Sequence, residues 1–187
     1  MYLWEIFTKQ DNLCADCRRK LIPFKKTTQV KGLSVYALYL YDDFMEECMF
    51  QIKEKKDQTL ASIFLYPYRS KLRKLLKNKV ITAVPSSDQK TNERGFHALE
   101  KMFKPIGYPI HHVFTKDDIK QSTLNSSQRS DISKHIHLVN PSMLIGQDVI
   151  LIDDVCTTGS SLLACTNALR PYVASINILV IAIYKLK

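Results

Sequence analysis

Hydrophobic and polar residues follow one another in two recognisable periods along most of this chain. Apolar side chains occupy every second position from Val35 to Tyr41, which predicts a β-strand, and Asp42 can then cap a helix in which Phe44, Cys48 and Ile52 share one face. The same two patterns recur towards the C-terminus. Further strands are expected at 80–85, 108–114, 148–154 and 175–185, and further helices at 59–79 (bent near Pro67), 96–103 and 160–172.

Alternating strands and helices are typical of right-handed crossover connections. We therefore expect an α/β fold, with a mostly parallel twisted sheet and flanking helices. Residues 1–30 differ, because they are basic and carry little periodicity. We expect them to form a small N-terminal appendage and residues 31–187 to form the main domain.

Composition narrows the functional classes. Hydrophobic residues make up 45% and charged residues 24% of the 187 positions, as in globular proteins. No stretch approaches the roughly 20 apolar residues of a spanning helix, and the N-terminus lacks a signal-peptide pattern, so neither membrane insertion nor export is expected. The net charge of +9 favours anionic partners, and the five scattered cysteines favour a reducing cytoplasm.

The segment VILIDDVCTTGSSL, residues 149–162, carries the clearest chemistry. A buried parallel strand is expected to end at Asp153 and Asp154, at the sheet edge where ligands of α/β proteins bind. A loop of small residues then enters a helix, whose free amides favour a phosphate. Paired carboxylates beside a phosphate suit sugar hydroxyls or Mg²⁺. We interpret the segment as a phosphosugar site rather than an ordinary helix cap, with these loop residues: Thr157, Thr158, Gly159, Ser160 and Ser161.

This segment resembles the phosphoribosyl pyrophosphate (PRPP) motif of the type I phosphoribosyltransferases. The resemblance implies that Asp153 and Asp154 hold the ribose hydroxyls, that residues 157–161 hold the 5′-phosphate, and that Mg²⁺ accompanies PRPP. Thr157 stands where the hypoxanthine-guanine branch has an aspartate, which argues against purine salvage of that type.

Other segments resemble the ComF family of competence proteins, in order along nearly the whole chain: LCADCRRKL, QIKEKKDQTLA, VITAVPSSDQKTNERGFHALEKM and TKDDIKQSTLNSSQRSDI. The resemblance implies a cytoplasmic protein of DNA uptake that works with a helicase-type ATPase on single-stranded DNA. It also implies an N-terminal zinc ribbon. Cys14 and Cys17 supply only half of the four ligands that a structural zinc site needs, so zinc is expected only if the site is completed elsewhere.

Several further positions are candidates for anion contact. Pro85 ends an expected strand and Ser86 and Ser87 follow it, at the place where the resemblance to the phosphoribosyltransferases implies a pyrophosphate loop, although an ordinary turn explains these residues as well. Arginine forks match phosphate oxygens, so Arg94 is a candidate, with solvated surface as its alternative. The same two interpretations apply to Lys53 and Arg129: each could contact phosphate or DNA, or each could be an ordinary solvated surface residue.

The segment Arg69–Lys79 carries six basic residues and no acid, beside Tyr66 and Tyr68. It could follow a nucleic-acid backbone while the tyrosines stack on bases, or it could be a solvated helix face.

Three functions remain open at this point. The chain could bind PRPP and single-stranded DNA in DNA uptake, transfer a phosphoribosyl group to a base in nucleotide salvage, or sense PRPP without turning it over. Residues 1–40 offer little that would recognise a base, which favours the first.

Overall fold

The computed structural model describes residues 14–86, 88–116 and 136–184. Its centre is a five-stranded sheet in the order β1-β2-β7-β6-β3. The strands β2 (Leu33–Tyr41), β7 (Ser175–Tyr184), β6 (Asp148–Cys156) and β3 (Val80–Ala83) are parallel, and β1 (Pro23–Val30) is antiparallel to β2. This confirms the α/β class and the mostly parallel sheet.

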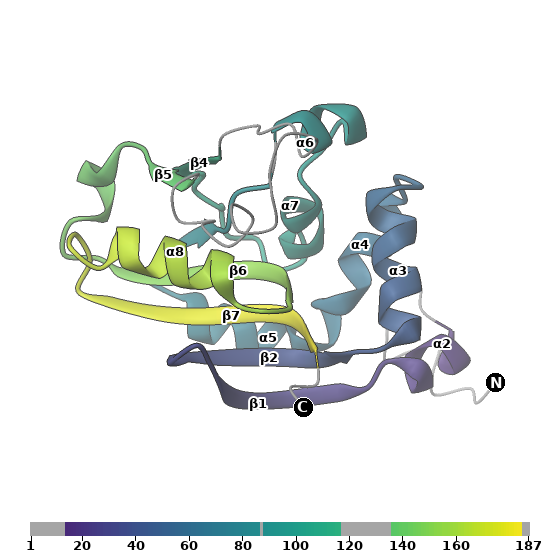
Figure 1. The fold of residues 1–187 in the computed structure, drawn as a ribbon. Coiled ribbons are helices and arrows are strands. Elements are labelled where there is room, and N and C mark those ends of the chain that lie inside the picture. Colours follow the sequence, from purple (N-terminus) through teal and green to yellow (C-terminus); the bar gives the residue numbers. More distant parts are fainter. Residues whose placement is uncertain (1–13, 87, 117–135, 185–187) are drawn as a thin grey trace.

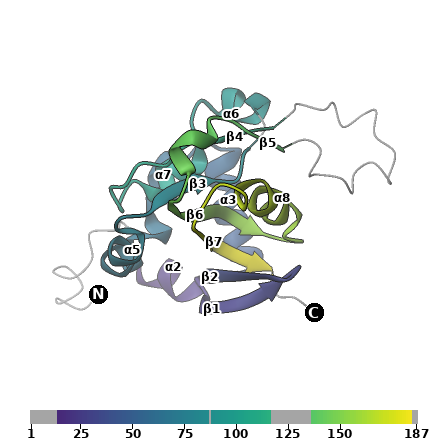
Figure 2. The same ribbon diagram turned by 90° about the vertical axis from the view of Figure 1, so that its left-hand side faces the viewer.

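Helices cover both faces of the sheet, and Figure 2 shows α8 and α5 on opposite sides of it. Helix α8 (Ser160–Leu169) buries Leu162, Cys165 and Leu169 against one face. Helices α3 (Asp43–Lys53), α4 (Gln58–Ala61), α5 (Arg69–Leu76) and α7 (Ala98–Phe103) cover the other (Figure 1). The sheet is therefore buried on both sides, which is why β6 and β7 are almost continuously aliphatic.

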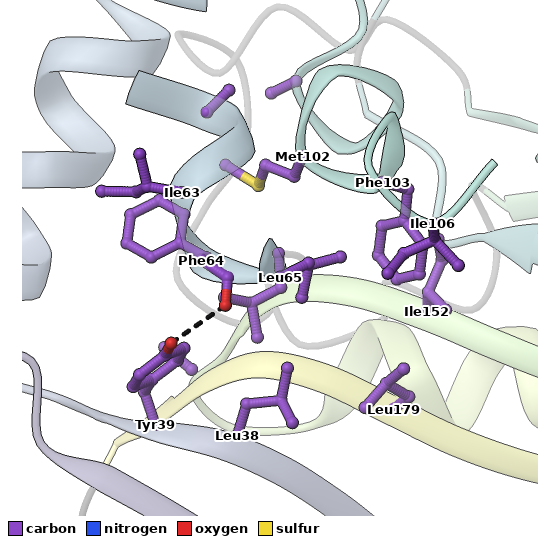
Figure 3. Close-up of a cluster of buried hydrophobic side chains, with 14 of the residues drawn as sticks. Leu38, Tyr39, Ile63, Phe64, Leu65, Met102, Phe103, Ile106, Ile152 and Leu179 are labelled. Atoms are coloured by element: carbon purple, nitrogen blue, oxygen red, sulfur yellow. Dashed lines mark hydrogen bonds between the residues drawn. The ribbon is translucent and has the colours of Figure 1, made fainter. Parts of the chain in front are cut away.

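Pro67 interrupts the helical segment before α5, as expected. The chain there passes through two short 3₁₀ helices, η1 (Ser62–Phe64) and η2 (Tyr66–Tyr68). Tyr39 of β2 donates a hydrogen bond from its hydroxyl to the carbonyl oxygen of Phe64, at 2.9 Å, inside a core of large apolar side chains (Figure 3). This bond satisfies a buried polar group and ties the 3₁₀ segment to the sheet.

The N-terminal part differs from the expected appendage. Helix α2 (Ala15–Lys20) leads into β1, which pairs with β2 from Val30 back to Pro23. The turn between the two strands, at Lys31 and Gly32, has positive φ angles of 50° and 76°, as tight hairpins require. Residues 23–30 are thus an edge strand of the central sheet and continue into the main domain.

Two other expectations need correction. Residues 108–114 do not form a strand, because only His111 makes a bridge, to Thr82, and regular pairing starts at β4 (Phe114–Lys116). Strand β4 pairs with β5 (Ile136–Leu138), which the pattern does not predict, and the 3₁₀ helix η6 (Pro141–Leu144) follows. Helix α6 (Asp88–Arg94) is a further addition to the expected elements, and α7 begins at Ala98 instead of Phe96.

Among the described residues, no helix has both the length and the apolar character needed to cross a bilayer.

Candidate functional site

The two acids lie inside strand β6, which continues to Cys156, beyond the expected end at Asp154. Asp153 pairs with Val180 of β7, and the ladder continues to Cys156, which pairs with Ile183. Strand β3 runs beside β6 on the other side, and the Val84 amide still donates to the Ile152 carbonyl oxygen. The acids therefore lie at the carboxyl edge of the parallel strands, where β7 still pairs with β6 while the last bond from the β3 side reaches Ile152, and only the loop from Thr157 onward leaves the sheet.

Adjacent positions in a strand point to opposite faces, and the two acids follow that rule. Asp154 faces α3, where the Nζ atom of Lys53 lies 2.6 Å from its Oδ2 atom. Asp153 faces α8, and its charge contributes to the raised pKa of Cys165 on that helix. The pair thus lines both sides of the strand end.

Asp153 has an unusual protonation equilibrium. Burial is the largest cause that raises its pKa, followed by the charge of Asp154, and together they bring the pKa to about 8. The Asp154 amide donates to the Asp153 Oδ1 atom at 2.9 Å, and this bond, with the charges of Lys53 and Lys116, acts in the opposite direction. Lys116 of β4 is a cation near the acids that the sequence pattern does not single out.

The loop after β6 surrounds a small hollow. It has a volume of about 100 Å³, which suits one phosphate-sized group, and it is lined by Asp153 and residues 155–162. Thr157 and Thr158 are exposed, and the Thr158 Oγ1 atom lies 3.1 Å from the Ser160 Oγ atom. The first turn of α8 starts here, and its leading amides have no intrahelical acceptor. The structure thus brings hydroxyls and helix amides together beside Asp153.

Gly159 allows the loop to turn. Its φ angle is +72°, in the left-handed region, and a Cβ atom built there would lie 2.5 Å from the Cγ1 atom of Val30. Val30 belongs to β1, so a residue of the segment expected to be an appendage supports the loop from behind. No sequence signal indicates this contact, because Val30 is far from the motif along the chain.

The expected pyrophosphate loop is only partly described. Pro85 and Ser86 come one residue after the end of β3, next to Val84, whose amide bonds to Ile152 of β6, and Ser87 lies outside the described residues. The Ser86 hydroxyl is 2.9 Å from the Thr91 hydroxyl on α6. The side chain of Ser86 is thus held by α6, which leaves backbone groups as the more available donors.

Arg94 and Lys53 are brought together, and Arg129 lies outside the described residues. The Nε atom of Arg94, at the end of α6, donates to the carbonyl oxygen of Lys53 at 3.0 Å. Lys56 makes a second link from the α3 side, donating to the Glu93 carbonyl oxygen at 2.6 Å. Arg94 and Lys53 thus form one connected group with Asp154.

The residues at the acids do not build a cage for a resident metal ion. Lys53 already lies against Asp154, and across the described part of the chain no three His, Cys, Asp or Glu side chains converge on a point. At the N-terminus, the Sγ atom of Cys14 accepts from the Cys17 amide at 3.4 Å, which lowers the pKa of the Cys14 thiol.

The basic segment around α5 forms a surface with two tyrosines. Arg69, Lys71, Arg73, Lys74 and Lys77 are exposed, whereas Lys79 lies 3.8 Å from Asp148. The Lys71 ammonium is 3.2 Å from the Tyr36 hydroxyl, and Lys25 lies over the Tyr68 ring. Tyr68 also packs edge-on against Tyr39, so it is a less open stacking platform than the sequence suggests.

No family model matches the chain. The chain is 29% identical over 129 residues to competence protein ComFC of Bacillus subtilis (strain 168), which covers 67% of this chain and 53% of that protein. This confirms the resemblance to the ComF family, and the match spans about half the length of the curated relative.

Among solved structures, a hypoxanthine phosphoribosyltransferase from Staphylococcus aureus matches with a TM-score of 0.41 and 17% identity, over 68% of this chain and 67% of that one. The allosteric regulatory enzyme of purine biosynthesis matches with a TM-score of 0.37 and 17% identity, over 65% of this chain and 26% of that one.

Proposed function

We propose that this chain, a relative of competence protein ComFC, works in the cytoplasm in DNA uptake and binds PRPP or a related phosphosugar at the end of β6. The observation that carries the sugar site is the position of Asp153 and the loop 157–161 around one hollow at the carboxyl edge of the sheet, with Asp154 next to Asp153 on the opposite side of the strand end. The carboxylates accept hydrogen bonds from ribose hydroxyls, and the loop amides and hydroxyls donate to the 5′-phosphate.

The proposed pocket is tested by calorimetric titration of PRPP with Mg²⁺ into the wild type and into the double variant Asp153→Asn, Asp154→Asn. We expect the double variant to bind at least about tenfold more weakly, because amide groups of the same shape replace the charge-assisted acceptor at Asp154 and the carboxyl group at Asp153, whose raised pKa of about 8 leaves it partly protonated at neutral pH. Asp148→Asn is the matched control, since Asp148 lies at the other end of the same strand.

Equal affinity in the wild type and the double variant would contradict the pocket assignment. Release of pyrophosphate when a base is added would instead indicate the salvage transferase, which uses the same ribose site.

The same proposal assigns single-stranded DNA to the basic surface formed by the exposed residues of the α5 segment: Arg69, Lys71, Arg73, Lys74 and Lys77. A row of cations without acids neutralises phosphates whatever the base sequence. The helicase-type ATPase implied by the family resemblance is the proposed partner on that strand.

The DNA surface is tested by fluorescence anisotropy with labelled oligonucleotides of several sequences over a range of salt concentrations. We expect tight binding at low salt, with log K falling against log salt by a slope of about 0.7 for each phosphate that the protein neutralises. Lys71→Ala with Lys74→Ala should therefore make the slope shallower by roughly 1.4. Lys101→Ala with Lys104→Ala, at the end of α7, is the control of equal charge. Absence of binding at low salt would remove DNA from the proposal.

A further inference from the structure

Lys53 and Asp154 form an ion pair that is largely shielded from water. Their Nζ and Oδ2 atoms are 2.6 Å apart, and the two side chains are only 29% and 18% exposed. Shielding strengthens the attraction between opposite charges compared with a pair on the surface. The ammonium of Lys53 is therefore a fixed positive charge beside one of the two carboxylates that line the strand end.

The position of Lys53 is held by two links between helices. Lys53 is the last residue of α3, and its carbonyl oxygen accepts from the Arg94 Nε atom at 3.0 Å. Lys56 extends from the same helix end to the Glu93 carbonyl oxygen at 2.6 Å. Both links join the end of α3 to the end of α6, so the backbone around Lys53 is fixed at two points. A charge positioned in this way does not need to be ordered when a ligand arrives.

The arrangement has a consequence for divalent cations. Mg²⁺ requires oxygen ligands in nearly octahedral geometry, and Asp154 already has its Oδ2 atom against an ammonium. A cation at that oxygen would have to displace Lys53 and would meet its charge at close range. Lys53 thus supplies, next to the site of the ribose hydroxyls, the positive charge that a bound metal ion supplies in other phosphate sites.

We propose that Lys53 takes the place of a divalent cation beside Asp154, so that this chain binds a phosphorylated ribose without magnesium. The inference rests on the proposed phosphosugar site. It defines the role of Lys53 as charge compensation of Asp154, which keeps that carboxylate oriented as an acceptor for a ribose hydroxyl while lowering the repulsion between Asp154 and the anionic ligand.

Ribose 5-phosphate is the probe for the test, because it lacks the diphosphate with which PRPP itself chelates Mg²⁺. Calorimetric titration of the full chain is carried out in EDTA and in millimolar Mg²⁺. We expect the two dissociation constants of the wild type to agree within about twofold, and Lys53→Met to bind about tenfold more weakly in EDTA with part of the affinity restored by Mg²⁺. PRPP is titrated in parallel.

Two variants separate the role of the charge from other effects. Lys55→Met removes an equal charge from the exposed end of the same helix region, where the Lys55 ammonium lies over the Phe50 ring, and it should behave as the wild type. Lys53→Arg keeps a cation at the site and should keep binding in EDTA close to that of the wild type. Thermal melting of each variant verifies that it is folded. The comparison of the wild type in EDTA and in Mg²⁺ tests the inference even if a variant fails to fold.

The outcomes distinguish this inference from the function on which it rests. If the wild type binds ribose 5-phosphate only when Mg²⁺ is present, the role of Lys53 is refuted while the phosphosugar site stands. If neither ribose 5-phosphate nor PRPP binds in either buffer, the proposed function itself fails and the inference fails with it.

Discussion

A Gly159→Ala variant is expected to lose roughly 2–4 kcal/mol of its free energy of unfolding, the largest effect that we predict for a single methyl group. Two causes add. The φ angle of +72° costs a residue with a side chain about 1–2 kcal/mol, and the new Cβ atom would lie 2.5 Å from the Val30 Cγ1 atom, which forces the hairpin or the loop to move. Urea denaturation monitored by circular dichroism measures the loss of stability.

Gly146→Ala is the matched control for Gly159→Ala. Gly146 has nearly the same φ angle, +70°, but a Cβ atom there would meet nothing within 4 Å. It should therefore show the backbone cost alone. Val30→Ala combined with Gly159→Ala removes the clashing methyl group, so the double variant should be more stable than the sum of the two single changes. If Gly159→Ala is no less stable than Gly146→Ala, the close approach of Val30 to the loop does not exist in solution.

The second large effect is expected for Asp153→Asn, which should stabilise the ligand-free protein increasingly as the pH rises. The folded pKa of about 8 lies above the ordinary aspartate value of 3.8, so between these values the folded state holds a proton that the unfolded state has released. The stability of the wild type must therefore fall as the pH rises through this window. An asparagine side chain does not titrate in this range, so the free energy of unfolding of the Asp153→Asn variant does not fall with pH for this reason.

Thermal melting of both proteins at several pH values within that window tests the prediction. The advantage of Asp153→Asn over the wild type should grow towards pH 8, while Asp148→Asn should follow the wild type, because Asp148 is exposed at the other end of β6. Parallel melting curves for Asp153→Asn and wild type would show that Asp153 is an ordinary carboxylate. A stability gain that accompanies loss of ligand binding is the common signature of a functional site.

Local patterns are sufficient to predict the elements that the core buries. Strands β2, β6 and β7 and helices α3 and α8 agree with the expected ones, because continuous or periodic apolar residues dictate how each of them packs. Strand β1 lacks such a pattern because it lies at the sheet edge, where most of its side chains are exposed and backbone hydrogen bonds to β2 supply most of its contacts, with Val30 as its one buried side chain. The segment 108–114 is apolar enough for a strand, but Pro109 has no amide hydrogen to donate, and before Val113 only His111 meets a neighbouring strand.

The candidate site likewise has one part that the sequence predicts and one part that it does not. Asp153, Asp154 and the loop 157–161 are contiguous in sequence, so their chemistry can be predicted from one segment. The contacts of Lys53 with Asp154 and of Val30 with Gly159 join distant segments, and they depend on where α3 and β1 pack. No periodicity encodes such pairs, which is why the sequence alone does not decide whether Lys53 contacts phosphate or belongs to plain surface.

The hairpin formed by β1 and β2 has a practical consequence for anyone who shortens this protein. Removing everything before residue 31 would strip the sheet of its outer strand and leave the backbone groups of β2 open to pairing with other molecules. It would also delete the valine that lies behind the loop of the proposed phosphosugar site, so we expect the truncated protein to aggregate and to lose support for that loop, whether or not the removed cysteines bind zinc.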